Sequence, residues 1–277
     1  GGYSAFVFDI TDYVQGKQSV AIRVDVTNID TDSIPINVDY TQWAGIYRDV
    51  ELISTEEQYI ALEDYGSSGL YIDSTINGND AEVSLRAKVS NKAEQDANLT
   101  LSVKVKDASE NLVANAQQDI TAPAGTVAGE YALSTIISGV HLWQGVRDPY
   151  LYTLNVSILN SNGQVLDSEE QKFGVREFEI KDGKAYLNGE EYEIHGVGYH
   201  QDREGYGNAA GRAQKEEDVK LMLEMGVNAV RTAHYPHDQY VYELMDENGL
   251  VVYNEIPYYL LLSKAESYQS SVTEQLK

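Results

Sequence analysis

The sequence predicts a multidomain protein that combines antiparallel β-structure with a parallel α/β unit. Two observations support this prediction. Over the first 173 residues, apolar and polar residues alternate in short runs separated by turn residues, as in half-buried strands. After residue 176, short apolar strands alternate with helices that end in glycine, which is typical of repeated βα units. The change of pattern predicts a domain boundary near residue 174.

The composition excludes several classes of partner. The chain has 277 residues, with 44 acidic against 20 basic side chains and a net charge of −24. Nucleic-acid and anionic-membrane binders need clustered cations, so neither class is expected. The chain has no cysteine, which excludes disulfide frameworks and thiol chemistry, and no apolar run approaches the ~20 residues of a membrane span.

Residues 1–56 are predicted to be the final part of a larger β-sandwich. Residues 4–10, 19–26 and 45–53 alternate as strands do, and the polar stretch 28–39 is expected to be a loop. A few strands cannot bury a core of their own, because an isolated hairpin is only marginally stable in water. We therefore expect the remainder of this domain to precede the chain.

Residues 57–174 are predicted to form a complete antiparallel sandwich of the immunoglobulin-like kind. Strands are expected at 71–76, 81–89, 99–105 and 152–159, separated by turn clusters rich in Asn and Gly. In the strands at 81–89 and 99–105 the apolar residues share one face, as the two inner faces of a sandwich require. No residue pattern in this domain indicates chemistry.

Residues 175–277 are predicted to form the beginning of an α/β barrel. The expected order is a strand at 191–199, a helix at 214–225, a strand at 227–232, a helix at 238–248 and a strand at 250–255. Asp238 is a suitable helix N-cap, and Gly226 and Gly249 stand where a left-handed residue closes a helix. A complete TIM barrel needs about 250 residues, so only its first three βα units are expected here.

Ionisable residues follow each of these three strands. His200 and Asp202 follow the first strand, Arg231 and His234 lie at the end of the second, and Glu255 ends the third. The carboxyl ends of parallel strands meet at one edge, where binding sites of such folds are found. Imidazole, guanidinium and carboxylate groups around one opening suit hydrogen bonding to the hydroxyl groups of a sugar.

Each of these residues also has a structural interpretation, which the sequence leaves open. Arg231 and Glu255 could form an ion pair that serves the fold alone. His200 and His234 could bond only to loop backbone, and Asp202 could be a solvated loop charge.

Four histidines, at positions 195, 200, 234 and 237, raise the question of a metal site. Residues five apart on an extended strand point to opposite faces, so His195 and His200 are not expected to converge. His234 and His237 flank a proline in a loop and form a weak pair. We therefore predict no metal ligands, and we interpret the glycine-rich run 205–211 as a flexible loop because it lacks phosphate-binding spacing.

Several motifs resemble one known family over the whole chain. The longest runs from NAVRTAHYP at 228–236 to GLVVY at 249–253 and is similar to the signature of glycoside hydrolase family 2. Supporting motifs are GIYRDV at 45–50, HLWQGVRDPYLY at 141–152, and FGVR at 173–176 followed by LNG at 187–189. Within the family, HQDREG at 200–205 and AHYPHDQY at 233–240 look most like bacterial β-galactosidases.

The resemblance implies a retaining exo-β-glycosidase that removes terminal β-D-galactose. It implies that residues 1–56 end a jelly-roll sugar-binding domain, that 57–174 form the immunoglobulin-like domain and that 175–277 begin the (β/α)8 catalytic barrel. It also places His200, Asp202, Arg231, His234 and Glu255 around the substrate sugar.

Two departures limit what this chain is expected to do alone. The family's acid/base and nucleophile Glu residues follow the fourth and seventh barrel strands, so neither is expected within these 277 residues and the chain alone is predicted to be inactive. Relatives with an active-site magnesium continue into a Glu-Thr-His segment, whereas residues 256–262 read IPYYLLL. No cofactor is therefore predicted, although the full-length protein could hold magnesium or sodium through other residues.

Other functions remain open from the sequence. The full-length protein could instead be a β-glucuronidase or a β-mannosidase, the chain could be a non-catalytic carbohydrate-binding module, and a metal hydrolase is a third class. A bacterial origin is implied, but the compartment, cytoplasmic or exported, and self-association as a homo-oligomer are not determined.

Overall fold

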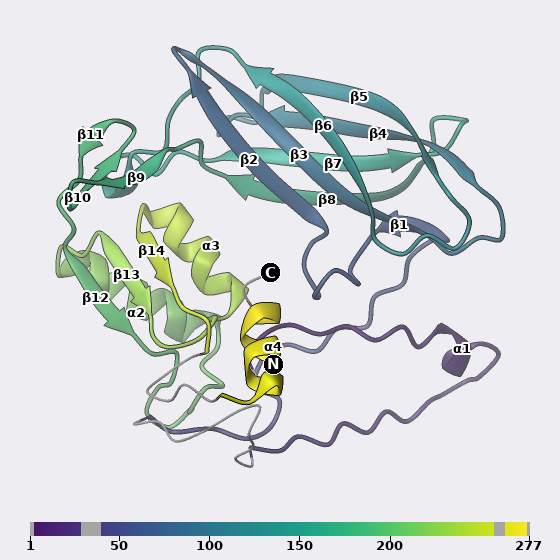
Figure 1. Cartoon of the computed structure of the whole chain (residues 1–277), viewed down its shortest axis with the longest axis horizontal. Helices are drawn as coiled ribbons and strands as arrows, with labels where there is room; N and C mark the ends of the chain where they lie inside the picture. Colours follow the sequence, from purple (N-terminus) through teal and green to yellow (C-terminus); the bar gives the residue numbers. More distant parts are fainter. Residues whose placement is uncertain (1–2, 29–39, 258–263, 276–277) are drawn as a thin grey trace. The chain divides into compact units, whose positions relative to one another are not determined.

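The computed structural model describes residues 3–28, 40–257 and 264–275 and divides into two compact units (Figure 1). The first comprises Gly1–Glu51, His195–Leu244 and Val252–Lys277. The second comprises Leu52–Ile194 and Met245–Val251.

The second unit contains a sandwich of two antiparallel sheets. The first sheet consists of β1 (Gln58–Ile60), β2 (Leu70–Asn77), β3 (Asp80–Asn91) and β6 (Gly129–Ile137). The second has the order β5 (Leu112–Ala122), β4 (Ala97–Lys106), β7 (Tyr152–Leu159) and β8 (Val165–Phe173). In the first sheet, β1 and β2 pair with successive parts of one edge of β3, and β6 pairs with the other edge.

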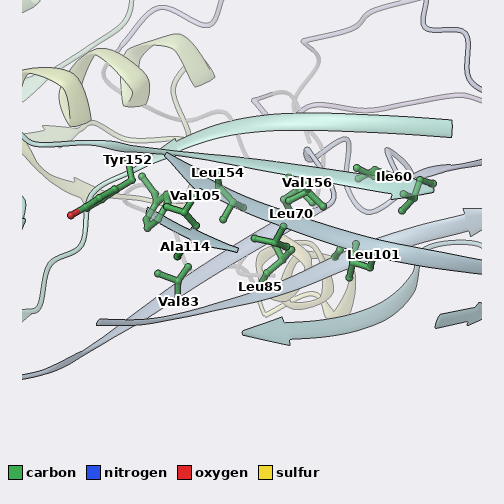
Figure 2. Close-up of a cluster of buried hydrophobic side chains, with 14 of the residues drawn as sticks. Ile60, Leu70, Val83, Leu85, Leu101, Val105, Ala114, Tyr152, Leu154 and Val156 are labelled. Carbon is green, nitrogen blue, oxygen red and sulfur yellow. The ribbon is translucent and has the colours of Figure 1, made fainter. Parts of the chain in front are cut away.

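The core of this unit lies between the two sheets. Burial alternates along β3 and β7, so that every second side chain points inward, as the sequence predicts. Figure 2 shows members of this cluster, including Leu85, Leu101 and Leu154, which are all at most 1% exposed. Each such side chain contributes about 1.5–3 kcal/mol on burial, so this core is the main source of stability for the unit.

All four strands predicted in 57–174 are present, and four more were missed. The missed strands are β1, β5, β6 and β8. β6 and β8 show mostly intermediate and exposed positions, so their sequences lack the clear apolar alternation of β3.

After the sandwich strands in the sequence, the second unit continues into a small antiparallel sheet. It is formed by β9 (Phe178–Lys181), β10 (Lys184–Leu187) and β11 (Glu190–Glu191). The single strand predicted at 191–199 is therefore wrong over its first half. Tyr192 leaves the sheet after its N–H donates to Ala185, and the second half forms a separate strand.

The end of helix α3 (Gln239–Asn248) packs within the second unit. The indole Nε1 of Trp143 donates to the carbonyl of Asp246 at 2.8 Å, and Arg176 pairs with the Asp246 carboxylate at 2.9 Å. At Gly249, which follows the helix with φ of +77°, a Cβ atom would lie 2.2 Å from the backbone of Gly145. Only glycine fits this position, which explains the helix stop that the sequence predicts.

The first unit contains a three-stranded sheet in the order β12 (Gly196–Tyr199), β13 (Ala229–Thr232), β14 (Val251–Asn254). β12 and β13 are parallel, and Tyr199 is level with Thr232. Helix α2 (Arg212–Glu224) connects them, α3 leads to β14, and α4 (Glu266–Gln275) follows. The order of elements confirms the predicted β-α-β-α-β succession.

The two predicted caps are also confirmed. The amide of Tyr240 donates to the Asp238 carboxylate at 2.9 Å, so Asp238 caps α3. Gly226 has a φ of +79°, and the amides of Gly226 and Val227 donate to the last turn of α2.

The strands predicted at 4–10, 19–26 and 45–53 are absent. Within the described part of residues 3–56, the one regular element is the short helix α1 (Thr11–Val14). Alternating apolar side chains such as Phe8 (73% exposed), Ile22 (67%) and Leu52 (83%) face solvent. A strand forms only where a neighbour supplies backbone partners and an apolar face, and none of the described segments pairs with these residues. Of the predicted loop 28–39, residues 29–39 lie outside the described chain.

None of the helices in the described ranges has the length and apolar character needed to cross a bilayer.

Candidate functional site

The candidate site lies within the first unit, where β12, β13 and β14 end. His200 directly follows β12, His234 follows β13 by two residues, and Glu255 directly follows β14. Because Tyr199 and Thr232 are paired in register, the loops after β12 and β13 begin at the same level. The structure thus gathers four of the five predicted residues, His200, Arg231, His234 and Glu255, into one cluster.

Arg231 and Glu255 form a two-point ion pair. Arg231 Nε donates to Glu255 Oε1 at 2.7 Å, and Arg231 Nη2 donates to Oε2 at 3.2 Å. The pairing predicted as a structural alternative is therefore present. It does not exclude contact with a ligand, because the side chain of Arg231 remains 45% exposed.

His234 joins this pair through one ring nitrogen. Its Nδ1 lies 2.9 Å from Arg231 Nη2 and 3.0 Å from Glu255 Oε2. A ring nitrogen carries either a proton or a lone pair, so Nδ1 donates to Glu255 or accepts from Arg231 but does not do both. Burial disfavours the charged form of Glu255, yet its contacts with Arg231 and His234 outweigh this effect and hold the pKa of this carboxyl below its ordinary value.

His200 lies beside His234. The two rings meet edge to face with centroids 5.2 Å apart, and His200 Nδ1 is 3.3 Å from the hydroxyl of Tyr235. The two histidines are thus held by side chains, not by loop backbone alone. Two imidazoles and a carboxylate–guanidinium pair offer both donors and acceptors on one surface.

Asp202 is separate from this cluster. Asp202 is exposed, and its carboxylate makes no hydrogen bond or ion pair with the described residues. Burial first, and then the negative charge of Asp202, raises the pKa of Tyr235, so the carboxylate lies near the cluster without joining it. The neighbouring Arg203 turns away and binds Glu217 and Asp218 of α2.

The aromatic residues that cover the cluster were not predicted from the sequence. The ring of Tyr40 lies 5.3 Å from His200, 5.8 Å from His234 and 5.4 Å from Tyr235, and Tyr3 stacks on Tyr235 at 4.1 Å. These contacts join positions about 160 to 230 apart in the sequence, so no local pattern could have predicted them. Aromatic faces beside hydrogen-bonding groups favour ligands with both C–H surfaces and hydroxyls.

Arg48 was also missed as part of this region. Its guanidinium donates to the carbonyls of Tyr3 (2.6 Å) and Pro236 (2.8 Å) and to Gln201 Oε1 (3.2 Å). One cation therefore fixes the N-terminal segment and the loops after β12 and β13. The motif at 45–50 was the available signal, but its alternating pattern was interpreted as a strand.

His237 is buried and uncharged. It is 3% exposed, its Nε2 lies 3.3 Å from the carbonyl of Ala233, and its Nδ1 has no described partner. Burial lowers its pKa to about 4. Among the residues that the structure describes, no group of three potential metal-binding side chains is found. In the glycine-rich run 205–211, the amide of Gly211 donates to the side-chain oxygen of Gln214 at 3.1 Å.

Comparison with known proteins assigns the family. Residues 67–176 match the family model "Glycosyl hydrolases family 2", and residues 178–271 match "Glycosyl hydrolases family 2, TIM barrel domain". The chain belongs to glycoside hydrolase family 2. The matches cover β2 to β8 of the sandwich and the strands that carry the cluster, so the resemblance identified from the sequence is confirmed.

The family members to which the chain is similar carry two different names, β-glucuronidase and β-galactosidase. The chain is 38% identical over 262 residues to a β-glucuronidase of Bacteroides fragilis, covering 93% of this chain and 37% of that protein. It is 35% identical to a β-galactosidase of Priestia megaterium, covering 90% of this chain and 23% of that protein. The structure of the Bacteroides uniformis β-glucuronidase superposes with a TM-score of 0.83 at 31% identity, covering 91% of this chain and 30% of that one. The chain thus spans between 23% and 37% of the length of these relatives.

Proposed function

We propose that this chain is part of a retaining exo-β-glycosidase and supplies one wall of its sugar subsite. The observation that supports this proposal is the Arg231–Glu255–His234 cluster beside His200, at the ends of the parallel strands. In the same proposal, residues 1–56 belong to a jelly-roll sugar-binding domain and 57–174 form an immunoglobulin-like domain. Residues 175–277 then begin the catalytic TIM barrel.

In this proposal, Glu255 organises the subsite and does not react. A retaining mechanism needs a nucleophile and an acid/base about 5–5.5 Å apart, and the acid requires a raised pKa. Glu255 is held ionised by Arg231 and His234, and Asp202 stands apart from it. We therefore place both catalytic carboxyls outside these 277 residues and expect the chain alone to be inactive.

The residues of the cluster would bind and orient the sugar. The imidazoles can donate to or accept from ring hydroxyls, while the Arg231–Glu255 pair keeps His234 in place. Such contacts lower the barrier only as far as they hold the sugar in the geometry of the reaction. Asp202, exposed at the edge, is available to accept a further hydroxyl.

A terminal β-galactoside is our first candidate substrate. Two arginines near the described strand ends already face carboxylates, Arg231 with Glu255 and Arg203 with Glu217, while Arg48 donates to neutral carbonyl oxygens. Arginines that already pair with carboxylates give little attraction to a further one, and a chain of net charge −24 repels anions. A neutral sugar fits this charge distribution.

A β-glucuronide is the second candidate, and a specific observation favours it. Two of the most similar proteins, from Bacteroides fragilis at 38% and Formosa agariphila at 34% identity, are named as a β-glucuronidase and a putative one. The carboxylate of a uronic acid would then bind a cation outside the described residues.

The test is to assay the full-length protein and the 277-residue chain on nitrophenyl β-galactoside, β-glucuronide and β-mannoside. We expect turnover of the galactoside by the full-length protein and none by the chain. Turnover by the chain would contradict the assignment of the catalytic carboxyls. Sugar binding without turnover by the full-length protein would instead favour a non-catalytic carbohydrate-binding module.

A further inference from the structure

One amide oxygen connects the ends of β13 and β14. Asn254 is the last residue of β14, and its Oδ1 lies 2.8 Å from Thr232 Oγ1, 2.8 Å from the Tyr242 hydroxyl and 3.1 Å from the amide nitrogen of Glu255. A backbone N–H can only donate, so the atom that faces Glu255 must be the acceptor oxygen of the amide. The two hydroxyls are then donors to the same oxygen.

Tyr242 extends this connection to the loop that carries His234. Its hydroxyl accepts the backbone N–H of His237 at 2.8 Å while it donates to Asn254. Burial raises the pKa of Tyr242, so the phenol keeps its proton and its donor role throughout the neutral range. The loop from His234 to His237 and the end of β14 are therefore joined through two side chains.

Glu255 is consequently fixed at both ends. Its carboxylate is held by Arg231 and His234, and its backbone N–H is held by Asn254. We propose that Asn254 and Tyr242 are positioning residues, which set the distance between Glu255 and His234 without touching the sugar. This proposal rests on the sugar subsite proposed above.

The simpler possibility is that this network only stabilises the strand ends. The positioning role and the purely structural role predict different results for His234 when a mutation disrupts the network. If Asn254 positions Glu255, removing its oxygen changes the partner of His234 Nδ1, since that nitrogen lies between Arg231 and Glu255. If the role is only structural, stability falls and the ring environment of His234 is unchanged.

The first experiment uses the 277-residue chain and the ring ¹⁵N chemical shifts of His234. The variants are Tyr242→Phe, Asn254→Ala and Asn254→Asp. The matched control is Tyr240→Phe. It also removes a tyrosine hydroxyl from α3, but one that donates to Glu216 and not to Asn254. We expect Tyr242→Phe and Asn254→Ala to shift the His234 signals. Asn254→Asp, which keeps an acceptor oxygen, and Tyr240→Phe should leave them near their original values.

The second experiment measures kcat and KM of the same variants in the full-length protein. We expect kcat/KM to fall about tenfold for Tyr242→Phe and Asn254→Ala, equivalent to about 1.4 kcal/mol, and to recover in Asn254→Asp. Unchanged His234 signals in Asn254→Ala would overturn the proposal. So would an Asn254→Asp variant whose signals and kcat/KM match those of Asn254→Ala. Shifted signals in a full-length protein without glycosidase activity would uphold the positioning role and reject the proposed function.

Discussion

His234 makes contact with both members of the Arg231–Glu255 pair through a single ring nitrogen. Replacing it with Ala leaves that pair intact but removes a donor or acceptor from the sugar-facing surface. We expect kcat/KM of the full-length protein to fall about a hundredfold, or about 2.7 kcal/mol, with a much smaller loss of stability. The measurement compares kinetics with thermal unfolding, and an unchanged kcat/KM would show that His234 serves the fold alone.

His237 makes the stability of the first unit depend on pH. Its folded pKa of about 4 lies below the ordinary value of 6.5, so the folded chain excludes a proton that the unfolded chain binds between these values. The contribution of neutral His237 is complete above pH 6.5 and is lost as the pH falls towards 4, a change of about 3 kcal/mol.

Urea unfolding between pH 7 and 4 tests this expectation. His237→Gln, which keeps an amide donor for the Ala233 carbonyl, should flatten the pH dependence over this range. His195→Gln, at an exposed position, is the control and should not. Equal slopes in both variants would contradict the assignment to His237.

Among the site residues, those at the ends of strands were predicted from the sequence, and those whose position depends on a loop were missed. His200, Arg231, His234 and Glu255 follow from the carboxyl ends of short strands, whose directions are fixed. The separation of Asp202 from them depends on how a loop turns. Tyr40 reaches the cluster from a distant part of the chain, and a local pattern cannot show such a contact.

Two glycines that end helices differ in what surrounds them. Gly226 and Gly249 have nearly the same φ, +79° and +77°, but a Cβ at Gly226 would meet open space, whereas one at Gly249 would collide with Gly145. Gly226→Ala should therefore cost about 1–2 kcal/mol of backbone strain. Gly249→Ala should cost about 1–3 kcal/mol more through overpacking. Denaturant unfolding of the two variants measures the difference, and equal losses would show that the collision is relieved without cost.

Strands could be predicted from the sequence where they pair with adjacent strands of the same sheet. The alternation in β3, β4 and β7 determines the inner face because each pairs with adjacent strands of the same sheet. The same alternation at 4–10 and 19–26 shows only which face a partner would cover. Without paired strands among the described residues, these segments form no regular structure and stay largely exposed.

For the whole molecule, the net charge of −24 predicts a response to salt. Raising NaCl from about 10 to 150 mM shortens the screening length from about 30 to 8 Å and weakens self-repulsion more than it weakens close ion pairs. The melting temperature of the chain should rise over this range, as measured by circular dichroism. KCl at equal ionic strength should raise the melting temperature in the same way. A falling melting temperature would show that the attraction within ion pairs outweighs the self-repulsion of the chain.

The two compact units each contain one of the two tryptophans of the chain. Trp43 is in the first unit and 47% exposed, whereas Trp143 is in the second, 1% exposed and bonded to the carbonyl of Asp246. Their emission should therefore differ in wavelength, the buried indole emitting to the blue of the exposed one. A Trp43→Phe variant would leave the tryptophan signal of the second unit alone, so intrinsic fluorescence can follow the unfolding of that unit separately.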